Sequence, residues 1–168
     1  MALTIDWMTE LRSNPTQTVV PVFDAELVLQ SCDGVIVDAS WRIADQAMVS
    51  EPLSEWGQQV QRYLLDSRQP LQLKLLRQGS DYGHRVWNVL LKIPIGQVLT
   101  YSEVAKKLDS GPRAVARACR DNPYAGIIPC HRVVAKSGLG GFMGQTEGVM
   151  VDLKRHILVH ERKLAQRL

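Results

Sequence analysis

The spacing of apolar residues changes near the middle of this chain, and that change constrains the fold most. Before residue 77, apolar residues occur in short runs such as TVVPVFDAELVLQ and LQLKLL, with the lengths typical of strands. After residue 83 they recur every three or four residues, as in amphipathic helices. The polar stretch RQGSDYG separates the two patterns. We therefore predict an N-terminal domain over residues 1–79 and a C-terminal domain over residues 80–168.

The N-terminal pattern predicts an α/β lobe. The Asp33-Gly34 step is a hairpin signal between the runs TVVPVFDAELVLQ and VIVDASW, with Cys32 in the turn. Ser54 predicts the start of a helix, which we expect to end at Pro70 before the strand LQLKLL. The residues at helical spacing in it, and therefore expected in the core, are Trp56, Val60, Tyr63 and Leu64.

The C-terminal pattern predicts mostly helices. YSEVAKKL and PRAVARACRD read as two short helices joined by the turn Asp109-Ser110-Gly111, with Pro112 at the first helical position. Such a pair resembles a helix-turn-helix, although its periodicity fits any antiparallel helix pair. Arginines 113, 117 and 120 on the second helix favour DNA as the partner. A last amphipathic helix is predicted over VDLKRHILVHERKL.

The charge distribution supports a nucleic-acid partner for the C-terminal half. Residues 1–80 carry 6 Lys/Arg and 10 Asp/Glu, whereas residues 81–168 carry 14 and 7. The net charge of +3 thus combines an acidic half with a basic half. A chance imbalance of surface charge remains the alternative.

Composition excludes several classes of protein. No apolar run approaches the roughly 20 residues of a membrane span, and the N-terminus does not resemble a signal peptide. Three scattered cysteines make no disulfide framework, which favours the cytoplasm. His156 and His160 could together bind a metal, but without a third ligand nearby we favour a solvated helix face.

The segment GIIPCHRV places a potential nucleophile, Cys130, beside a potential base, His131. If the segment is extended, neighbouring side chains point to opposite faces, so the two do not touch directly. From these residues alone, Cys130 is either a reactive thiol or a buried structural cysteine, and the preceding isoleucines favour the second. Cys119, inside a predicted helix, reads as packing.

The surroundings of this segment are similar to the O6-alkylguanine-DNA alkyltransferases. The match to the family covers roughly Gly83 to Glu161 and rests on the order and spacing of several motifs. These are PCHRV, NP seven residues before its Pro-Cys pair, RAV on a helix before that, and TY before a helix. The resemblance implies an RNase H-like sheet plus helix in the α/β lobe, and a winged-helix or helix-turn-helix C-terminal domain.

The resemblance also implies the activity. The protein would transfer the alkyl group of O6-alkylguanine, and also of O4-alkylthymine, irreversibly to its own cysteine, in a single turnover with nucleotide flipping. The partner would be double-stranded DNA carrying the lesion. No cofactor is needed because the DNA is the alkyl donor, and we expect a monomer that does not bind membranes.

The resemblance assigns roles to individual residues. Cys130 would accept the alkyl group, and His131 would be the base, acting through a bridging water. Glu161 would hold the other imidazole nitrogen, Asn122 would tie the helix-turn-helix to the cysteine segment, and Tyr101 would donate to the departing guanine. Arg113 would fill the gap left by the flipped nucleotide, and the carbonyls of Cys130 and Val133 would accept from the guanine amino group. The other expected substrate or DNA contacts are Ala114, Arg132, Phe142 and Met143.

The sequence departs from the family pattern in two places. Ala125 stands where the family often has proline, and FMGQ at residues 142–145 replaces the usual Tyr-Ser-Gly-Gly. Phe142 can still stack on a base, whereas the replacement of serine by Met143 removes any contact that the serine hydroxyl would make. We hypothesise a wider range of alkyl groups. The alternatives are a non-catalytic lesion-binding protein, although such relatives lack the cysteine, and a cysteine hydrolase, which adjacent Cys and His suit poorly.

Overall fold

The computed structural model describes residues 2–44 and 52–167, and the chain divides into two compact units. The first unit comprises Met1–Gln78 together with Pro123–Ile127, and the second comprises Gly79–Asn122 together with Ile128–Leu168. A short piece of the C-terminal half thus belongs to the first unit, which the sequence pattern does not predict.

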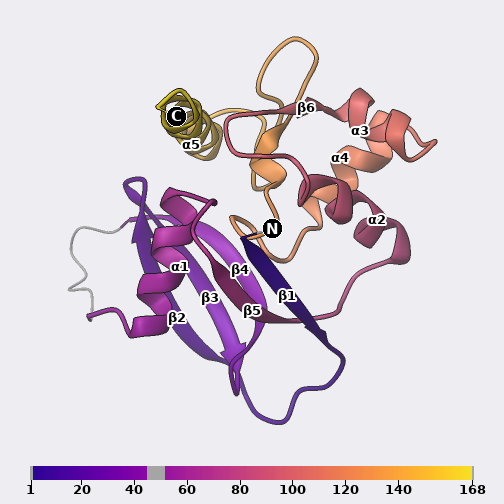
Figure 1. Cartoon of the computed structure of the whole chain (residues 1–168). Coiled ribbons are helices and arrows are strands. Elements are labelled where there is room, and N and C mark those ends of the chain that lie inside the picture. The colour runs from indigo at the N-terminus through magenta and orange to yellow at the C-terminus, as the bar shows by residue number, and fades with distance from the viewer. Residues whose placement is uncertain (1, 45–51, 168) are drawn as a thin grey trace. The chain divides into compact units, whose positions relative to one another are not determined.

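The first unit is a five-stranded mixed sheet with one helix, as Figure 1 shows. The strands lie in the order β1-β5-β4-β3-β2, with β2, β3 and β4 antiparallel and β5 parallel to both of its neighbours. Helix α1 contacts β2 and β5. The elements are β1 (Leu3–Met8), β2 (Thr16–Val22), β3 (Ala25–Cys32), β4 (Val35–Ile43), α1 (Glu55–Leu65) and β5 (Leu71–Leu76). The predicted α/β character of this half is confirmed.

Two tight hairpins shape this sheet. The predicted turn at Asp33-Gly34 is confirmed, and both residues have the positive φ angles (48° and 81°) of a two-residue hairpin turn. A second hairpin turns at Phe23-Asp24, with φ of 58° and 57°, where the sequence reads as one unbroken run. Without a glycine this turn has no clear local signal. Cys32 is the last residue of β3 and is buried, so its placement in the turn was wrong.

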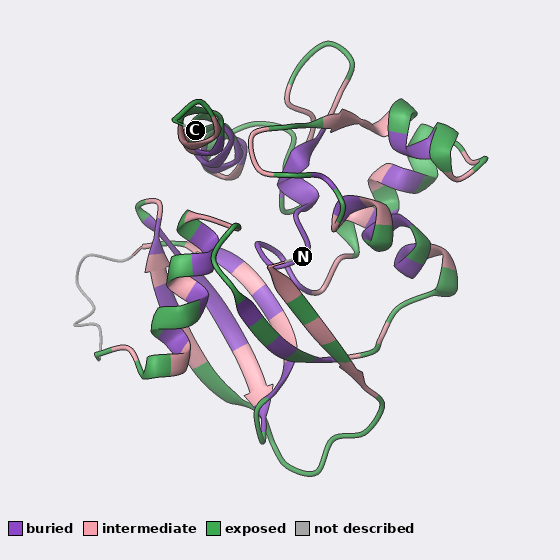
Figure 2. Ribbon diagram, viewed as in Figure 1, coloured by how far each residue is buried: buried purple, intermediate pink, exposed green. Residues whose placement is uncertain are grey.

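Helix α1 begins as predicted, because the Gly57 N–H donates to the side chain of Ser54 at 3.1 Å. It ends at Leu65, five residues before Pro70, where the chain turns through a hydrogen bond from the Gln69 N–H to the Asp66 carbonyl. Its buried positions and those of the strands form the core of this unit (Figure 2). The largest fully buried aliphatic residues of that core include Leu27, Leu29, Ile36 and Leu75.

The second unit consists of helices and one short strand pair (Figure 1). The helices predicted over YSEVAKKL, PRAVARACRD and VDLKRHILVHERKL are confirmed, and Pro112 lies in the first turn of α4 as expected. Ser80 caps the start of α2, and Thr100 and Glu103 form a capping box at the start of α3. Its elements are α2 (Asp81–Leu90), β6 (Leu99–Thr100), α3 (Tyr101–Lys107), α4 (Pro112–Arg120), the 3-10 turn η1 (Cys130–Arg132), β7 (Val133–Val134) and α5 (Val149–Ala165).

Helix α4 is held against α2 and α3. The Trp87 indole N–H donates to the carbonyl of Ala118 at 3.0 Å, and Val115 is completely buried. The arginines of α4 consequently remain on its exposed side. None of the helices in residues 2–44 and 52–167 is long and apolar enough to cross a membrane.

Candidate active site

Cys130 opens a 3-10 turn, so the expected extended conformation was wrong. Pro129 leads into the turn, in which the Arg132 N–H donates to the Pro129 carbonyl at 3.0 Å and the Val133 N–H donates to the Cys130 carbonyl. With three residues per turn, consecutive side chains point about 120° apart. Cys130 and His131 are therefore both buried but directed differently.

His131 is held by a buried carboxylate. Its Nε2 lies 2.6 Å from Oε1 of Glu161, and the two side chains are 5% and 4% exposed. Burial lowers the pKa of His131 despite the opposing effect of Glu161, so the imidazole is neutral at neutral pH. Burial raises the pKa of Glu161, but His131 and Arg132 outweigh it and the pKa falls to about 2.

These two protonation states define the tautomer of the imidazole. An ionised carboxylate only accepts, so Nε2 carries the proton and donates it to Glu161. The lone pair then lies on Nδ1, which is buried and has no hydrogen-bond partner among the described residues. Nδ1 of His131 is thus available as a proton acceptor inside the protein.

Arg132 completes this cluster. Its Nε donates to both carboxylate oxygens of Glu161, at 3.2 and 3.0 Å, its Nη2 donates to Oε2, and its Nη1 donates to the Ile93 carbonyl at 2.8 Å. The side chain is 7% exposed. We expected Arg132 to contact substrate or DNA, but the structure places it behind Glu161, where it stabilises the carboxylate charge.

The thiol of Cys130 is shielded from solvent. Burial raises its pKa, while a hydrogen bond from the Asn122 side chain and the charge of Lys154 lower it, and burial prevails. Cys130 is consequently a thiol at neutral pH and needs a base before it can attack. Asn122 also donates from Nδ2 to the Ile128 carbonyl at 3.0 Å, which ties the end of α4 to the segment before Cys130.

The short parallel strand pair brings Tyr101 toward the same site. Leu99 of β6 pairs with Val133 of β7, and Tyr101 is the next residue after β6. Burial raises the pKa of Tyr101 to about 12, with smaller contributions from the thiols of Cys119 and Cys130, so the phenol keeps its proton. Gly140 (φ +73°) lies against this ring, and a Cβ there would come within 2.9 Å of Tyr101 Cε2.

Lys154 is a site residue that sequence reasoning missed. It is completely buried on α5, and its Nζ donates to the carbonyls of Val133 at 2.7 Å and Gly141 at 3.0 Å. The ammonium also lies 5.9 Å from the centre of the Tyr101 ring. Burial lowers its pKa to about 8 against the opposing effect of Cys130 and Cys119. Its only sequence signal is a lysine among the apolar positions of the helix, next to Leu153 and three residues before Ile157.

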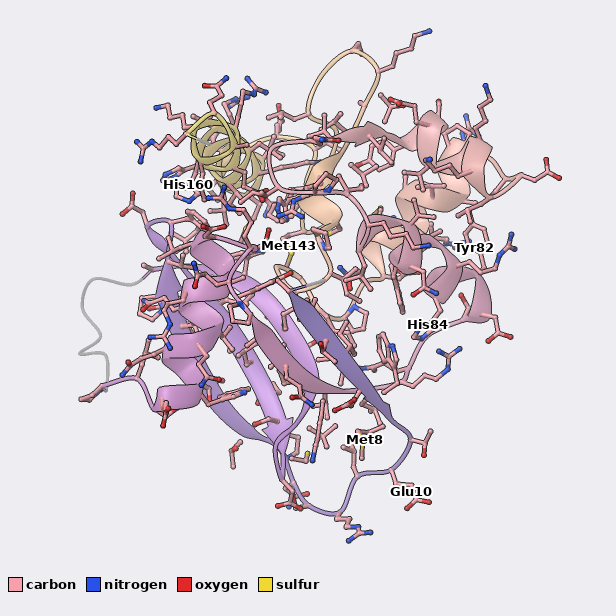
Figure 3. All side chains as sticks on the ribbon, in the orientation of Figure 1. Met8, Glu10, Tyr82, His84, Met143 and His160 are labelled. Carbon is pink, nitrogen blue, oxygen red and sulfur yellow. The ribbon has the colours of Figure 1, made fainter. Side chains whose placement is uncertain are left out.

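The loop that departs from the family pattern forms a tight turn. The Phe142 N–H donates to the Gln145 carbonyl at 2.8 Å, and the Gln145 N–H returns the bond at 3.0 Å. Met143 and Gly144 occupy the turn with φ of 51° and 76°. The Phe142 ring is buried, whereas Met143, labelled in Figure 3, is exposed.

The exposed side of α4 carries most of the remaining predicted residues. Arg113, Ala114 and Arg117 line a groove of about 580 Å³ together with the N-terminal turn of α2, where Tyr82 lies (Figure 3). The hydroxyl of Tyr82 is 2.7 Å from the Ser110 hydroxyl in the turn before α4. The groove borders both helices, and its lining is net basic because Arg113 and Arg117 outnumber Asp121.

The described residues hold no group of three or more His, Cys, Asp or Glu side chains that could bind a metal ion. His156, which we considered together with His160, is exposed on α5.

Comparison with known proteins agrees with the geometry. Residues 81–163 match the family described as 6-O-methylguanine DNA methyltransferase, DNA binding domain. The chain is 40% identical over 89 residues to a methylated-DNA–protein-cysteine methyltransferase of Archaeoglobus fulgidus, a match that covers 53% of this chain and 60% of that protein. It is 44% identical over 82 residues to the protein of that name from Methanocaldococcus jannaschii, covering 49% and 46%. The chain thus spans about half the length of the curated relatives it matches.

Structural similarity extends further along the chain. The crystal structure of Mycobacterium tuberculosis O6-methylguanine methyltransferase superposes with a TM-score of 0.67 at 28% identity, covering 89% of this chain and 93% of that one. The structure of Mycobacterium tuberculosis OGT in complex with DNA gives a TM-score of 0.66 at 29% identity, covering 86% and 91%. Residues 81–163, which include the buried Cys130, His131 and Glu161, are thus similar to the DNA binding domain of 6-O-methylguanine DNA methyltransferases, and the chain resembles O6-methylguanine methyltransferases in its fold.

Proposed function

We propose that this protein repairs DNA by transferring the alkyl group of O6-alkylguanine in a duplex to Sγ of Cys130. The observation that carries this proposal is the buried Cys130 beside a neutral His131 that Glu161 orients at 2.6 Å. The proteins it resembles are named for transfer from methylated DNA to a protein cysteine. Because the thioether is stable, each molecule reacts once.

The thiol proton leaves through His131. Nδ1 of the imidazole is the available acceptor, and a buried polar atom of this kind needs a hydrogen-bond partner. We propose that a water molecule links Nδ1 to Cys130 and carries the proton. Glu161, kept ionised by Arg132, then stabilises the imidazolium that forms.

Attack of the thiolate forms the S–C bond and breaks the bond between the alkyl carbon and O6. The electron pair goes to the guanine, which becomes an anion unless it is protonated. Tyr101 donates this proton, because burial keeps the phenol protonated at neutral pH. The imidazolium returns a proton to the tyrosinate through solvent, so the net transfer is from the thiol to guanine.

The carbonyls of Cys130 and Val133 would hold the guanine amino group. The Cys130 carbonyl already accepts a hydrogen bond from the Val133 N–H, and the Val133 carbonyl accepts one from Nζ of Lys154. A carbonyl has two lone pairs, so each has capacity for one more donor. Lys154 thereby positions the carbonyl that recognises the base.

We propose that α3 and α4 bind duplex DNA as a helix-turn-helix of the winged-helix type. Arg113, Ala114 and Arg117 are exposed on α4, and the groove beside them is basic. Arg113, at the start of α4, would enter the duplex and occupy the place of the flipped nucleotide. Phe142 and Met143 would border the extruded base.

The test is intact mass spectrometry after incubation with a duplex that carries O6-methylguanine. We expect the gain of one methylene mass, with peptide mapping that locates it on Cys130, and no further product after one equivalent. A Cys130→Ala variant should bind the duplex and leave the lesion intact. An unchanged mass, or alkylation of Cys32 or Cys119, would contradict the proposal, and lesion binding without transfer would indicate a non-catalytic protein.

A further inference from the structure

The chain between α4 and Cys130 forms a closed loop. Its base lies in the second unit, where Asn122 Nδ2 donates to the Ile128 carbonyl at 3.0 Å. That carbonyl also accepts the Cys130 N–H at 2.8 Å. The tip of the loop, Pro123–Ile127, belongs to the first unit. A displacement of Ile128 would therefore alter the contacts of Asn122 and Cys130 together.

The tip is built into the sheet of the first unit. Strand β4 pairs with β5 at Val35 and Ile36. Further along β4, the Ala39 N–H donates to the Pro123 carbonyl at 2.7 Å, and the Ala39 carbonyl accepts the Ala125 N–H at 3.1 Å. Ala39 and Tyr124 thus form a parallel bridge, and the tip continues the pairing of β4.

Tyr124 anchors this tip through its hydroxyl. The ring is completely buried. Its hydroxyl accepts from Nε2 of Gln78 at 2.9 Å and lies within hydrogen-bonding reach of the carbonyls of Leu76 and Ile36. These partners come from the end of β5 and the middle of the sheet, so the phenol connects the tip to two strands.

Gly126 restricts the tip further. Its φ is +80°, and a Cβ there would come within 3.3 Å of the side chains of Leu64, Trp41 and Leu27. The backbone consequently lies directly against the apolar core, at a conformation that other residues rarely adopt. A tip with a paired strand, a buried hydroxyl and a tightly packed glycine has one well-defined position.

We propose that Tyr124 is a positioning residue for Cys130. It acts through the closed loop: the hydroxyl fixes the tip, and the tip holds Ile128 and Asn122 where they orient the thiol. Tyr124 is six residues from the nucleophile and belongs to the other unit. The inference rests on the proposed alkyl transfer only for its DNA-dependent test.

The experiment compares Tyr124→Phe, which removes one hydroxyl, with Val60→Ala, which removes buried volume from α1 of the same unit. The first measurement needs no DNA: the pH dependence of Cys130 alkylation by iodoacetamide, followed by peptide mass spectrometry. The second is the single-turnover rate of transfer at saturating lesion-bearing duplex. Circular dichroism establishes that each variant is folded, and Gln78→Ala, which removes one partner of the hydroxyl, is the milder second variant.

We expect Tyr124→Phe to shift the pH midpoint of Cys130 alkylation upward, because the Asn122 hydrogen bond to the thiol weakens. The transfer rate at saturating DNA should fall on the order of 10-fold, since small misplacements of reacting groups have large effects. Gln78→Ala should change both in the same direction, and Val60→Ala should lower stability alone. A wild-type midpoint and rate in both Tyr124→Phe and Gln78→Ala, or equal shifts of midpoint and rate in Val60→Ala, would overturn the inference. Failure of the wild type to react with DNA would refute the proposed function and leave the iodoacetamide comparison intact.

Discussion

The two units differ in what their cores contain. Within the described residues, the first unit buries one charged side chain, Glu26, whose partner Arg42 is 43% exposed. The second unit is of similar size but buries several titratable side chains: His84, His131, Arg132, Lys154 and Glu161. Of these, His131, Arg132 and Glu161 form a hydrogen-bonded cluster.

Burial of charge is unfavourable unless every charge is paired and hydrogen-bonded. The buried charges of Arg132, Glu161 and Lys154 have such partners, so removing one of these partners should leave a buried charge uncompensated. The first unit carries no such cluster and is organised by apolar packing and strand pairing. Equivalent substitutions in the two units should accordingly have different effects.

The largest difference is expected for matched glutamates. Glu161→Gln removes the charge that balances the buried Arg132, and should lower the free energy of unfolding by about 3–5 kcal/mol. It should also slow alkyl transfer at least about 100-fold, because the imidazolium loses its stabilising partner. Glu26→Gln should cost about 1 kcal/mol or less, since Arg42 remains solvated. Urea unfolding measures the loss of stability in each variant, and single-turnover kinetics measure the rate of transfer. Equal losses of stability in Glu161→Gln and Glu26→Gln would remove the distinction between the units.

A buried lysine should show itself in the pH dependence of stability. The pKa of Lys154 is about 8 in the folded protein against 10.5 ordinarily, so the unfolded chain binds more protons between these values. Its contribution to the free energy of unfolding therefore rises with pH from about 8 to 10.5, by up to about 3 kcal/mol. The half-buried Cys119, whose pKa is raised, acts in the opposite direction above about pH 9.

Only the difference between wild type and variant isolates the lysine. Lys154→Met should remove this rising contribution, whereas Lys74→Met, an exposed position on β5, should leave the pH dependence unchanged. Unfolding at a series of pH values measures it. Identical curves for wild type and Lys154→Met would show that the ammonium is solvated in the folded protein.

Substitutions at two glycines with positive φ distinguish the effect of backbone strain from a steric effect on the site. Gly140→Ala places a Cβ 2.9 Å from the Tyr101 ring, whereas Gly34→Ala, at φ +81°, meets no atom of the described residues within 4 Å. Each substitution should lower the free energy of unfolding by about 1–2 kcal/mol, because alanine is strained in the left-handed conformation. Only Gly140→Ala should also slow alkyl transfer, because Tyr101 must move. A normal rate in Gly140→Ala would mean that the ring position is not critical.

The smallest effect concerns the exposed arginines. Arg117→Ala on α4 should reduce the slope of log K against log salt for duplex binding by about 0.9, the value for one phosphate contact. Arg68→Ala in the first unit should leave the slope unchanged, since its guanidinium pairs with Asp66. A fluorescence-anisotropy titration in increasing salt measures both slopes, and a decrease for Arg68→Ala would place DNA on the first unit as well.

Features with local causes could be predicted from the sequence. The helix starts at Ser54, Thr100 and Pro112 depend on caps and on proline geometry within a few residues. The Asp33-Gly34 hairpin depends on two residues that tolerate positive φ. The hairpin at Phe23-Asp24 has the same geometry without the glycine, so its signal was missing.

Features with long-range causes could not be predicted. The inclusion of Pro123–Ile127 in the first unit depends on the free edge of β4 around Ala39, which is more than 80 residues away. Nothing in the segment itself indicates a strand partner. Arg132 was expected to contact substrate or DNA, and its burial depends on Glu161, which is 29 residues further along the chain.

The site shows the same division. The segment GIIPCHRV draws attention to Cys130 and His131, but the roles of Cys130, His131, Tyr101 and Glu161 come from the family resemblance. The structure brings His131 and Glu161 together, and its strand pair brings Tyr101 to the residues after Cys130. Lys154 was not predicted as a site residue, because a lysine in a helix is normally interpreted as solvated.

Helix α5 supplies both Lys154 and Glu161, seven residues apart. Seven residues are close to two turns, which places both side chains on one face. An insertion or deletion of one residue between them would rotate one of them by about 100° away from its carbonyl or imidazole partners. In natural variation this short stretch should therefore accept substitutions at its exposed positions but no change of length, unlike the loop at residues 142–148, where insertions leave the face of the helix intact.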